Sequence, residues 1–104
     1  MNREIFLDNN ATTQPLAQVV AAVVGAMSDS FGNPSSSNRT GERSRRLLQE
    51  ARDAVAEMIG APSDSVYFTS GATEANNWVL QRMCMKPKTS LVTTNIEHSS
   101  IKSL

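Results

Sequence analysis

Residues 65–82 read SVYFTSGATEANNWVLQR, and the pattern changes partway through this stretch. Ser65–Thr69 is rich in β-branched and aromatic residues, which favour a β-strand. Gly71 and its small neighbours interrupt that pattern, and a helix is expected from about Thr73 to Arg82. The stretch therefore predicts a strand that passes through a tight turn into a helix.

Two further short strands are expected on either side of this unit. Leu91–Thr94 follows the helix after Lys86-Pro87, and Ile5–Leu7 lies near the start of the chain. A strand, a crossover helix and a second strand favour parallel pairing with a right-handed connection. The predicted fold class is α/β, with a parallel-type sheet and flanking helices. Because a parallel sheet normally has several strands and covered faces, we expect the fold to be incomplete as it stands.

Two longer helices are expected before this unit. The first spans about residues 15–28, where apolar residues recur at 3.6-residue spacing. Pro15 is tolerated in its first turn, and Thr12 or Thr13 can cap it. The second begins at Glu42 and has Gly60 as its natural stop.

The segment between these helices, residues 29–41, is dense in Gly, Pro, Asn and Ser. Such a composition predicts a loop. A loop of this length is uncommon in a compact domain unless it is functional or disordered. The segment is therefore a candidate for part of a functional site.

Length and charge limit the classes of protein to which the chain can belong. The 104 residues fit one partial domain, and ten basic residues balance ten acidic ones. The net charge is zero and would not attract nucleic acid, so no nucleic-acid partner is expected. The longest apolar stretch, Leu16–Met27, is too short to cross a membrane, and the N-terminus lacks a secretory signal, which favours the cytoplasm. The single cysteine, Cys84, permits no intrachain disulfide, and no metal site is expected.

The turn before the third predicted helix is a candidate anion site. Gly71 allows a ligand to approach the backbone, and Thr73 places a hydroxyl at the helix start, where free N–H groups and the helix dipole favour negative charge. The alternative is a capped turn that binds nothing, since Ser and Thr are common before helices. A nucleotide P-loop is excluded because the GxxxxGK[ST] pattern is absent.

The only histidine, His98, follows the last predicted strand, at the edge where α/β folds collect ligands. Its imidazole can stack on a flat cofactor and move protons near neutral pH. Taken by itself, a helix-start histidine bonded to a neighbour is the simpler interpretation. Cys84 is expected to be a small buried packing residue rather than a nucleophile.

Five motifs in this order resemble the amino-terminal quarter of the pyridoxal-phosphate cysteine desulfurases of the NifS/IscS type. They are Leu7-Asp-Asn-Asn-Ala-Thr-Thr13, Gly32-Asn-Pro-Ser-Ser36, Ala51-Arg52, Phe68-Thr-Ser-Gly-Ala-Thr-Glu-Ala-Asn-Asn77 and Glu97-His98-Ser99. The resemblance implies the N-terminal part of a fold-type I transferase large domain. Residues 1–14 would be an N-terminal active-site segment, and residues 15–104 the start of the domain that binds pyridoxal 5′-phosphate.

The resemblance also implies an activity and its partners. Such enzymes remove sulfur from L-cysteine, leaving alanine and an enzyme persulfide, and pass the sulfur to iron-sulfur cluster assembly or other acceptors. They act as homodimers with a sulfur-acceptor or scaffold protein. Ala72 and Thr73 match positions that hold the cofactor phosphate, and His98 matches the histidine that stacks on the pyridine ring and shuttles protons. Residues beside the substrate pocket match Asn9, Asn10, Ala11 and Thr12.

The chain departs from the family pattern in one place and lacks several family residues. Asn38 stands where a histidine is common, and an amide cannot take a proton at neutral pH. The Schiff-base lysine, the aspartate that faces the pyridine nitrogen, the substrate-binding arginine and the persulfide cysteine are expected beyond position 104. The isolated chain is therefore predicted to be inactive. The alternatives are a selenocysteine lyase or another class V fold-type I enzyme, and a non-catalytic module that pairs with a full-length desulfurase.

Overall fold

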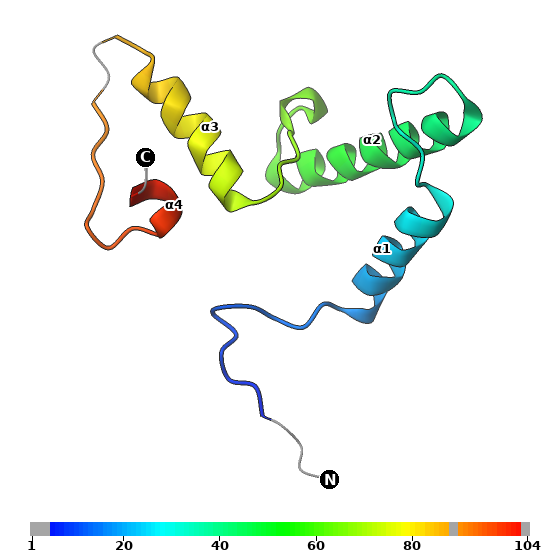
Figure 1. The fold of residues 1–104 in the computed structure, drawn as a ribbon, viewed down its shortest axis with the longest axis horizontal. Coiled ribbons are helices and arrows are strands. Elements are labelled where there is room, and N and C mark those ends of the chain that lie inside the picture. Colours follow the sequence, from blue (N-terminus) through cyan, green and yellow to red (C-terminus); the bar gives the residue numbers. More distant parts are fainter. Residues whose placement is uncertain (1–4, 88–89, 103–104) are drawn as a thin grey trace. The chain divides into compact units, whose positions relative to one another are not determined.

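The computed structural model describes residues 5–87 and 90–102 (Figure 1). Its elements in chain order are α1 (Ala17–Asp29), α2 (Arg39–Ile59), the 3-10 helix η1 (Ser63–Ser65), α3 (Ala72–Cys84) and α4 (Ser99–Lys102). The chain divides into two compact units, Met1–Ser63 and Asp64–Leu104. None of the helices in the described ranges is long and apolar enough to span a membrane.

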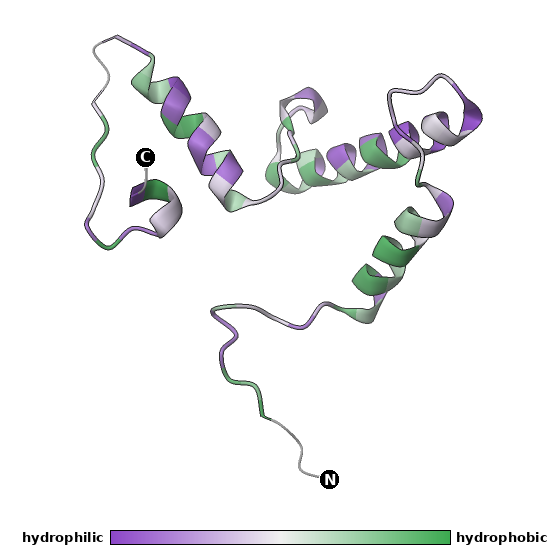
Figure 2. Ribbon diagram, viewed as in Figure 1, coloured by the Kyte–Doolittle hydropathy of each residue, from purple (hydrophilic) through white to green (hydrophobic). Residues whose placement is uncertain are grey.

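Helix α1 begins two residues later than the periodicity predicts. Its N-cap is Leu16, which has extended backbone and supplies no side-chain cap, so the predicted cap by Thr12 or Thr13 is wrong. Pro15 explains the difference, because a proline disfavours helical backbone at the residue before it and keeps both threonines outside the helix. The apolar character of α1 shows in its mostly hydrophobic colouring (Figure 2). The side chains of the predicted apolar face are exposed: Val19, Val20, Val23, Val24 and Met27.

Helix α2 begins at Arg39, three residues before the predicted start at Glu42. Asn38 causes the earlier start, because its side-chain oxygen accepts the N–H of Gly41 at 2.8 Å and satisfies one of the first orphan donors of the helix. The predicted stop at Gly60 is confirmed. Gly60 adopts the left-handed conformation with φ of 66°, which ends the helix with little strain. Asn38, for which the family resemblance predicts a histidine, acts here as a helix cap.

The loop between α1 and α2 folds onto the first turns of α2. The guanidinium groups of Arg43 and Arg45 donate to the backbone carbonyls of Asp29 and Pro34, each at 2.9 Å. Ser44, which is buried, donates its hydroxyl to the carbonyl of Ser30 at 2.6 Å. The predicted long loop is therefore an ordered segment that α2 holds by its own side chains.

Gly41 lies at the closest approach between this loop and α2. A Cβ atom at Gly41 would stand 2.6 Å from the carbonyl oxygens of both Asn33 and Ser36. Gly32 is similarly confined, since a Cβ there would lie 2.6 Å from the carbonyl group of Thr40. The absence of a side chain at both positions lets the two backbones pack against each other.

The three predicted strands are not formed within the described residues. Ile5–Leu7, Ser65–Thr69 and Leu91–Thr94 carry no strand within the described part of the chain, and η1 takes the first residue of the second segment. A strand requires backbone hydrogen bonds to a neighbouring segment, and strand propensity alone does not supply them. The expectation of a sheet from local propensity therefore finds no counterpart in the described ranges.

Helix α3 covers the predicted residues and extends two residues further, to Cys84. Cys84 is exposed, so the prediction that it is a buried packing residue is wrong. The reason is that little covers α3: the helix that packs against it, α4, spans only one turn. Among the described residues, the buried apolar side chains are only Ala56 and Val66.

Candidate functional site

The N-terminus of α3 has no side-chain cap. Gly71 is the N-cap residue and has extended backbone, and the first N–H to bond back is that of Ala75, which reaches the carbonyl of Gly71 at 3.2 Å. The N–H groups of Ala72, Thr73 and Glu74 precede that bond and have no acceptor within the helix. These donors and the Thr73 hydroxyl lie at the positive end of the helix dipole.

The turn before α3 is held by its own side chains. The hydroxyl of Thr69 donates to the carbonyl of Gly71 at 3.0 Å. The backbone N–H and the hydroxyl of Ser70 both donate to one carboxylate oxygen of Glu74, each at 2.7 Å. The Glu74 carboxylate is therefore bonded to the turn rather than to the free N–H groups of the helix.

These two bonds lower the pKa of Glu74 below its usual range, and the backbone N–H of Ser70 has the larger effect. A carboxyl whose pKa is lower in the folded state stabilises that state at a pH above its unfolded value. The contribution is lost as the pH falls through the folded pKa. We therefore expect the turn to loosen only below about pH 4.3, the ordinary glutamate value.

An NMR titration of the Ser70 amide tests this expectation. In the wild-type chain the amide shift should follow Glu74 with a midpoint below about 4.3. In Glu74→Gln the same shift should lose this step, because glutamine does not titrate. A wild-type midpoint at or above the ordinary glutamate value would contradict the assignment.

The donors at the start of α3 fit a phosphate group. Backbone N–H groups and a hydroxyl are what helix N-termini use to bind phosphate oxygens. A Cβ added at Gly71 would meet no atom within 4 Å, so the approach to the backbone is open. The nearest described negative charge in sequence, Glu74, is bonded to Ser70. The structure thus places the predicted Ala72 and Thr73 where they can hold an anion.

His98 lies immediately before α4, in the same unit as Thr73. Its Nδ1 accepts the backbone N–H of Ser100 at 3.1 Å and lies 2.8 Å from the Ser100 hydroxyl. The buried Ser100 hydroxyl in turn accepts the side-chain N–H of Asn76 at 3.0 Å. The histidine ring is thus linked through Ser100 to the middle of α3.

Asn76 and Ser100 form the hydrogen-bond chain to the predicted site residue His98, and the motifs did not single out either of them. Both lie inside or beside quoted motifs, but their spacing of 24 residues carries no local signal. A serine two residues after a helix-start histidine was the available clue for Ser100, since residues at this spacing can bond to the histidine side chain. Nothing comparable marks Asn76.

The segment Asn9–Thr12 forms a turn in the first unit. The N–H groups of Ala11 and Thr12 both donate to the carbonyl of Asp8, at 3.2 and 3.4 Å. Of the four predicted pocket residues, Asn9 and Thr12 line an open hollow of about 580 Å³, whereas Asn10 and Ala11 do not. The lining residues are Phe6, Asn9, Thr12, Thr13, Gln14 and Pro15.

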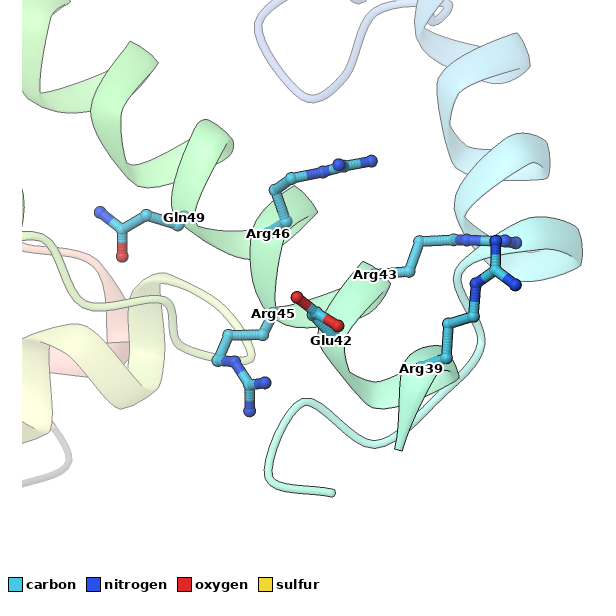
Figure 3. Close-up of a pocket in the computed structure, with 6 residues that line it drawn as sticks. All are labelled: Arg39, Glu42, Arg43, Arg45, Arg46 and Gln49. Atoms are coloured by element: carbon cyan, nitrogen blue, oxygen red, sulfur yellow. The ribbon is translucent and has the colours of Figure 1, made fainter. Parts of the chain in front are cut away.

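A second open hollow, of about 700 Å³, runs along the N-terminal half of α2 and is strongly basic. Figure 3 shows its lining, which consists of Arg39, Glu42, Arg43, Arg45, Arg46 and Gln49. Two of these arginines hold the preceding loop, and Arg46 lies 3.6 Å from the carboxylate of Glu50. The guanidinium groups of Arg45 and Arg46 point in different directions, so this hollow is a structural feature of the loop and α2 rather than an assembled anion site.

Comparison with known proteins gives consistent results. The family model for aminotransferase class-V matches residues 5–103. A selenocysteine lyase of Xenopus laevis is 37% identical over 97% of this chain and 27% of its own length. Proteins named cysteine desulfurase IscS from Methanosarcina thermophila and Dictyoglomus turgidum are 35% and 38% identical over 96% and 97% of the chain. The chain spans about a quarter of the length of the curated relatives it matches.

Proposed function

The chain belongs to the class-V aminotransferase family, and on that premise we propose that it forms the amino-terminal part of a pyridoxal-phosphate cysteine desulfurase. The reaction would convert L-cysteine to alanine and leave the sulfur as a persulfide on an enzyme cysteine, for iron-sulfur cluster assembly or another acceptor. The observation that carries this proposal is the uncapped start of α3, where Ala72 and Thr73 present donors within the family motif.

The same premise gives a proposal for the domain. Residues 1–14 are proposed as an N-terminal active-site segment and residues 15–104 as the start of a fold-type I large domain. In that fold the segments 65–69 and 91–94 would pair as parallel strands. The β-branched and aromatic residues of the first segment support this proposal, because such residues favour strands.

This chain's residues would hold the cofactor at two points. Ala72 and Thr73 would bind the phosphate through backbone N–H groups and a hydroxyl, and His98 is the proposed catalytic residue, with its ring against the pyridine. When bound, pyridoxal phosphate supplies an electron sink for bond cleavage in the amino acid. Asn9, Asn10, Ala11 and Thr12 are proposed to lie beside the substrate pocket, and a hollow lined by Asn9 and Thr12 supports this for two of them.

Binding of a cofactor analogue tests the proposed phosphate site directly. Pyridoxine 5′-phosphate has the ring and the phosphate but no aldehyde, so it cannot react with the three lysines of the chain. The single tryptophan, Trp78, lies in α3 and reports binding by fluorescence. We expect pyridoxine 5′-phosphate to bind more tightly than pyridoxine. Equal affinities would contradict the site.

The covalent chemistry requires a Schiff-base lysine and a persulfide cysteine. No residue of these 104 is matched to either of them by the family motifs. We propose that they follow in the same reading frame, that the complete enzyme is a cytoplasmic homodimer, and that it delivers sulfur to an acceptor or scaffold protein. Sequencing the transcript past the Leu104 codon tests this. A His-Lys pair and a later cysteine in frame would support the proposal, and an immediate stop codon would contradict it. The 104 residues with added pyridoxal phosphate should produce no alanine from cysteine.

Selenocysteine lyase activity is the second candidate. Proteins with that name from Bos taurus and Rattus norvegicus are 42% and 43% identical over 77% and 76% of this chain. Turnover of L-selenocysteine and L-cysteine by the product of the whole reading frame distinguishes the two. A strong preference for selenocysteine would favour the lyase.

A further inference from the structure

We propose that Asn76 and Ser100 are positioning residues that hold the His98 imidazole with its proton on Nε2, so that Nε2 meets a ligand as a hydrogen-bond donor. The identity of that ligand rests on the proposed function above. The tautomer itself rests on the hydrogen bonds of this chain alone. This tautomer limits what His98 can do toward a ligand, because an Nε2 that carries a proton can donate a hydrogen bond but cannot accept a proton.

The backbone N–H of Ser100 determines which ring nitrogen of His98 is unprotonated. A backbone N–H can only donate, and the N–H of Ser100 reaches Nδ1 of His98 at 3.1 Å. Nδ1 must therefore present its lone pair to this group. In a neutral imidazole one nitrogen carries the proton and the other does not, so the proton of His98 lies on Nε2.

The side chains agree with this assignment. The Ser100 hydroxyl lies 2.8 Å from Nδ1 and, facing a lone pair, directs its own proton there. Its oxygen is then left as an acceptor, and the amide N–H of Asn76 fills that role at 3.0 Å. The donors thus run in one direction, from Asn76 to Ser100 to His98. The hydroxyl of Ser100 could also accept from a protonated Nδ1, so the backbone N–H of Ser100, which can only donate, is the contact that fixes this direction.

Burial strengthens the arrangement. Ser100 is 4% exposed and Asn76 is half-buried, so water competes weakly for these bonds. Asn76 lies on α3 and Ser100 on α4, and these two helices pack against each other. The ring of His98 is therefore oriented relative to the same helix that carries Thr73.

A chemical consequence follows for the role of His98. The lone pair on Nδ1 receives two donors, and a proton can take that place only if both bonds break. While the first turn of α4 is intact, His98 offers an N–H donor at Nε2 and no free lone pair. It would thus bind and orient a ligand atom, and the family's proton shuttling would require α4 to open or another group to act.

Nitrogen NMR on the full 104-residue chain tests the proposal, because the sequence contains one histidine. At a pH high enough that the ring nitrogen shifts no longer change, the neutral ring should show an unprotonated signal at Nδ1 and a protonated one at Nε2. Ser100→Ala should shift the tautomer ratio about fivefold toward protonated Nδ1, as expected for loss of one hydrogen bond. Asn76→Ala should shift it in the same direction by less.

Two further variants separate positioning from general damage. Ser100→Thr keeps the hydroxyl and should restore the wild-type ratio. Asn77→Ala removes the neighbouring amide, which donates to the Thr73 carbonyl of its own helix at 2.7 Å, and should leave the ratio unchanged. A protonated Nδ1 in the wild type, or an unchanged ratio in Ser100→Ala, would overturn the proposal. Failure of pyridoxine 5′-phosphate to bind, with the tautomer as expected, would count against the proposed function alone.

Discussion

Replacement of Thr73 by valine should weaken the binding of pyridoxine 5′-phosphate about ten- to hundredfold. The change removes a hydroxyl and keeps the branched shape of the side chain. A hydrogen bond to a charged group is worth about 1.5–3 kcal/mol, which corresponds to this range of affinity. The backbone N–H groups of Ala72 and Thr73 remain, so the affinity should fall without vanishing. Quenching of Trp78 fluorescence measures both proteins under the same conditions.

Thr94→Val is the matched control for this experiment. Thr94 lies in the same unit, and its hydroxyl donates to Glu97 at 2.9 Å rather than to the start of α3. The control should bind pyridoxine 5′-phosphate as the wild type does, and both variants should bind pyridoxine equally. An equal loss in the two variants would show that the hydroxyl of Thr73 has no specific part in binding.

Gly41→Ala should destabilise the first unit by about 1–3 kcal/mol, the usual cost of forcing a methyl group into filled space. The new Cβ would stand 2.6 Å from two backbone oxygens, those of Asn33 and Ser36, and neither can turn away as a side chain would. The loop must move off α2 to make room. Urea unfolding followed by circular dichroism should give a lower midpoint, and the Ser36 amide should exchange faster with solvent.

Gly25→Ala is the opposite case in the same unit. Gly25 lies inside α1, and a Cβ there would meet no atom within 4 Å. Alanine should stabilise the helix by about 0.5–1 kcal/mol, because glycine loses more backbone freedom on folding. A midpoint that rises in Gly25→Ala and falls in Gly41→Ala confirms the packing of the loop on α2. Equal behaviour of the two variants would refute it.

The sequence predicted the helices well because their signals are local. Apolar spacing located α1, α2 and α3 to within a few residues, and Gly60 marked the end of α2. The starts were less accurate, since capping depends on which of several polar residues reaches a free N–H group. Asn38 does so for α2, whereas Pro15 excludes Thr12 and Thr13 from α1.

The predicted strands and the surroundings of His98 depend on contacts between residues far apart in sequence, which local patterns do not predict. Ser65–Thr69 has strand propensity, but it forms a strand only when it pairs with a neighbouring segment. Propensity does not predict which segment that is. The bond between Asn76 and Ser100 likewise joins residues that are 24 positions apart. The motifs located Thr73 and His98 as candidates, and only the packing of α3 on α4 showed what holds the histidine ring.

The thin apolar core has a thermodynamic consequence. Heat capacity rises on unfolding because apolar surface becomes hydrated, by about 1.2–1.5 kcal/mol/K for an ordinary domain of 100 residues. In the described part of this chain only Ala56 and Val66 are buried apolar residues, and the valines of α1 already meet solvent. Little new apolar surface would be hydrated on unfolding. The heat-capacity step of this chain should thus fall well below the ordinary value, and its stability should vary only gently with temperature.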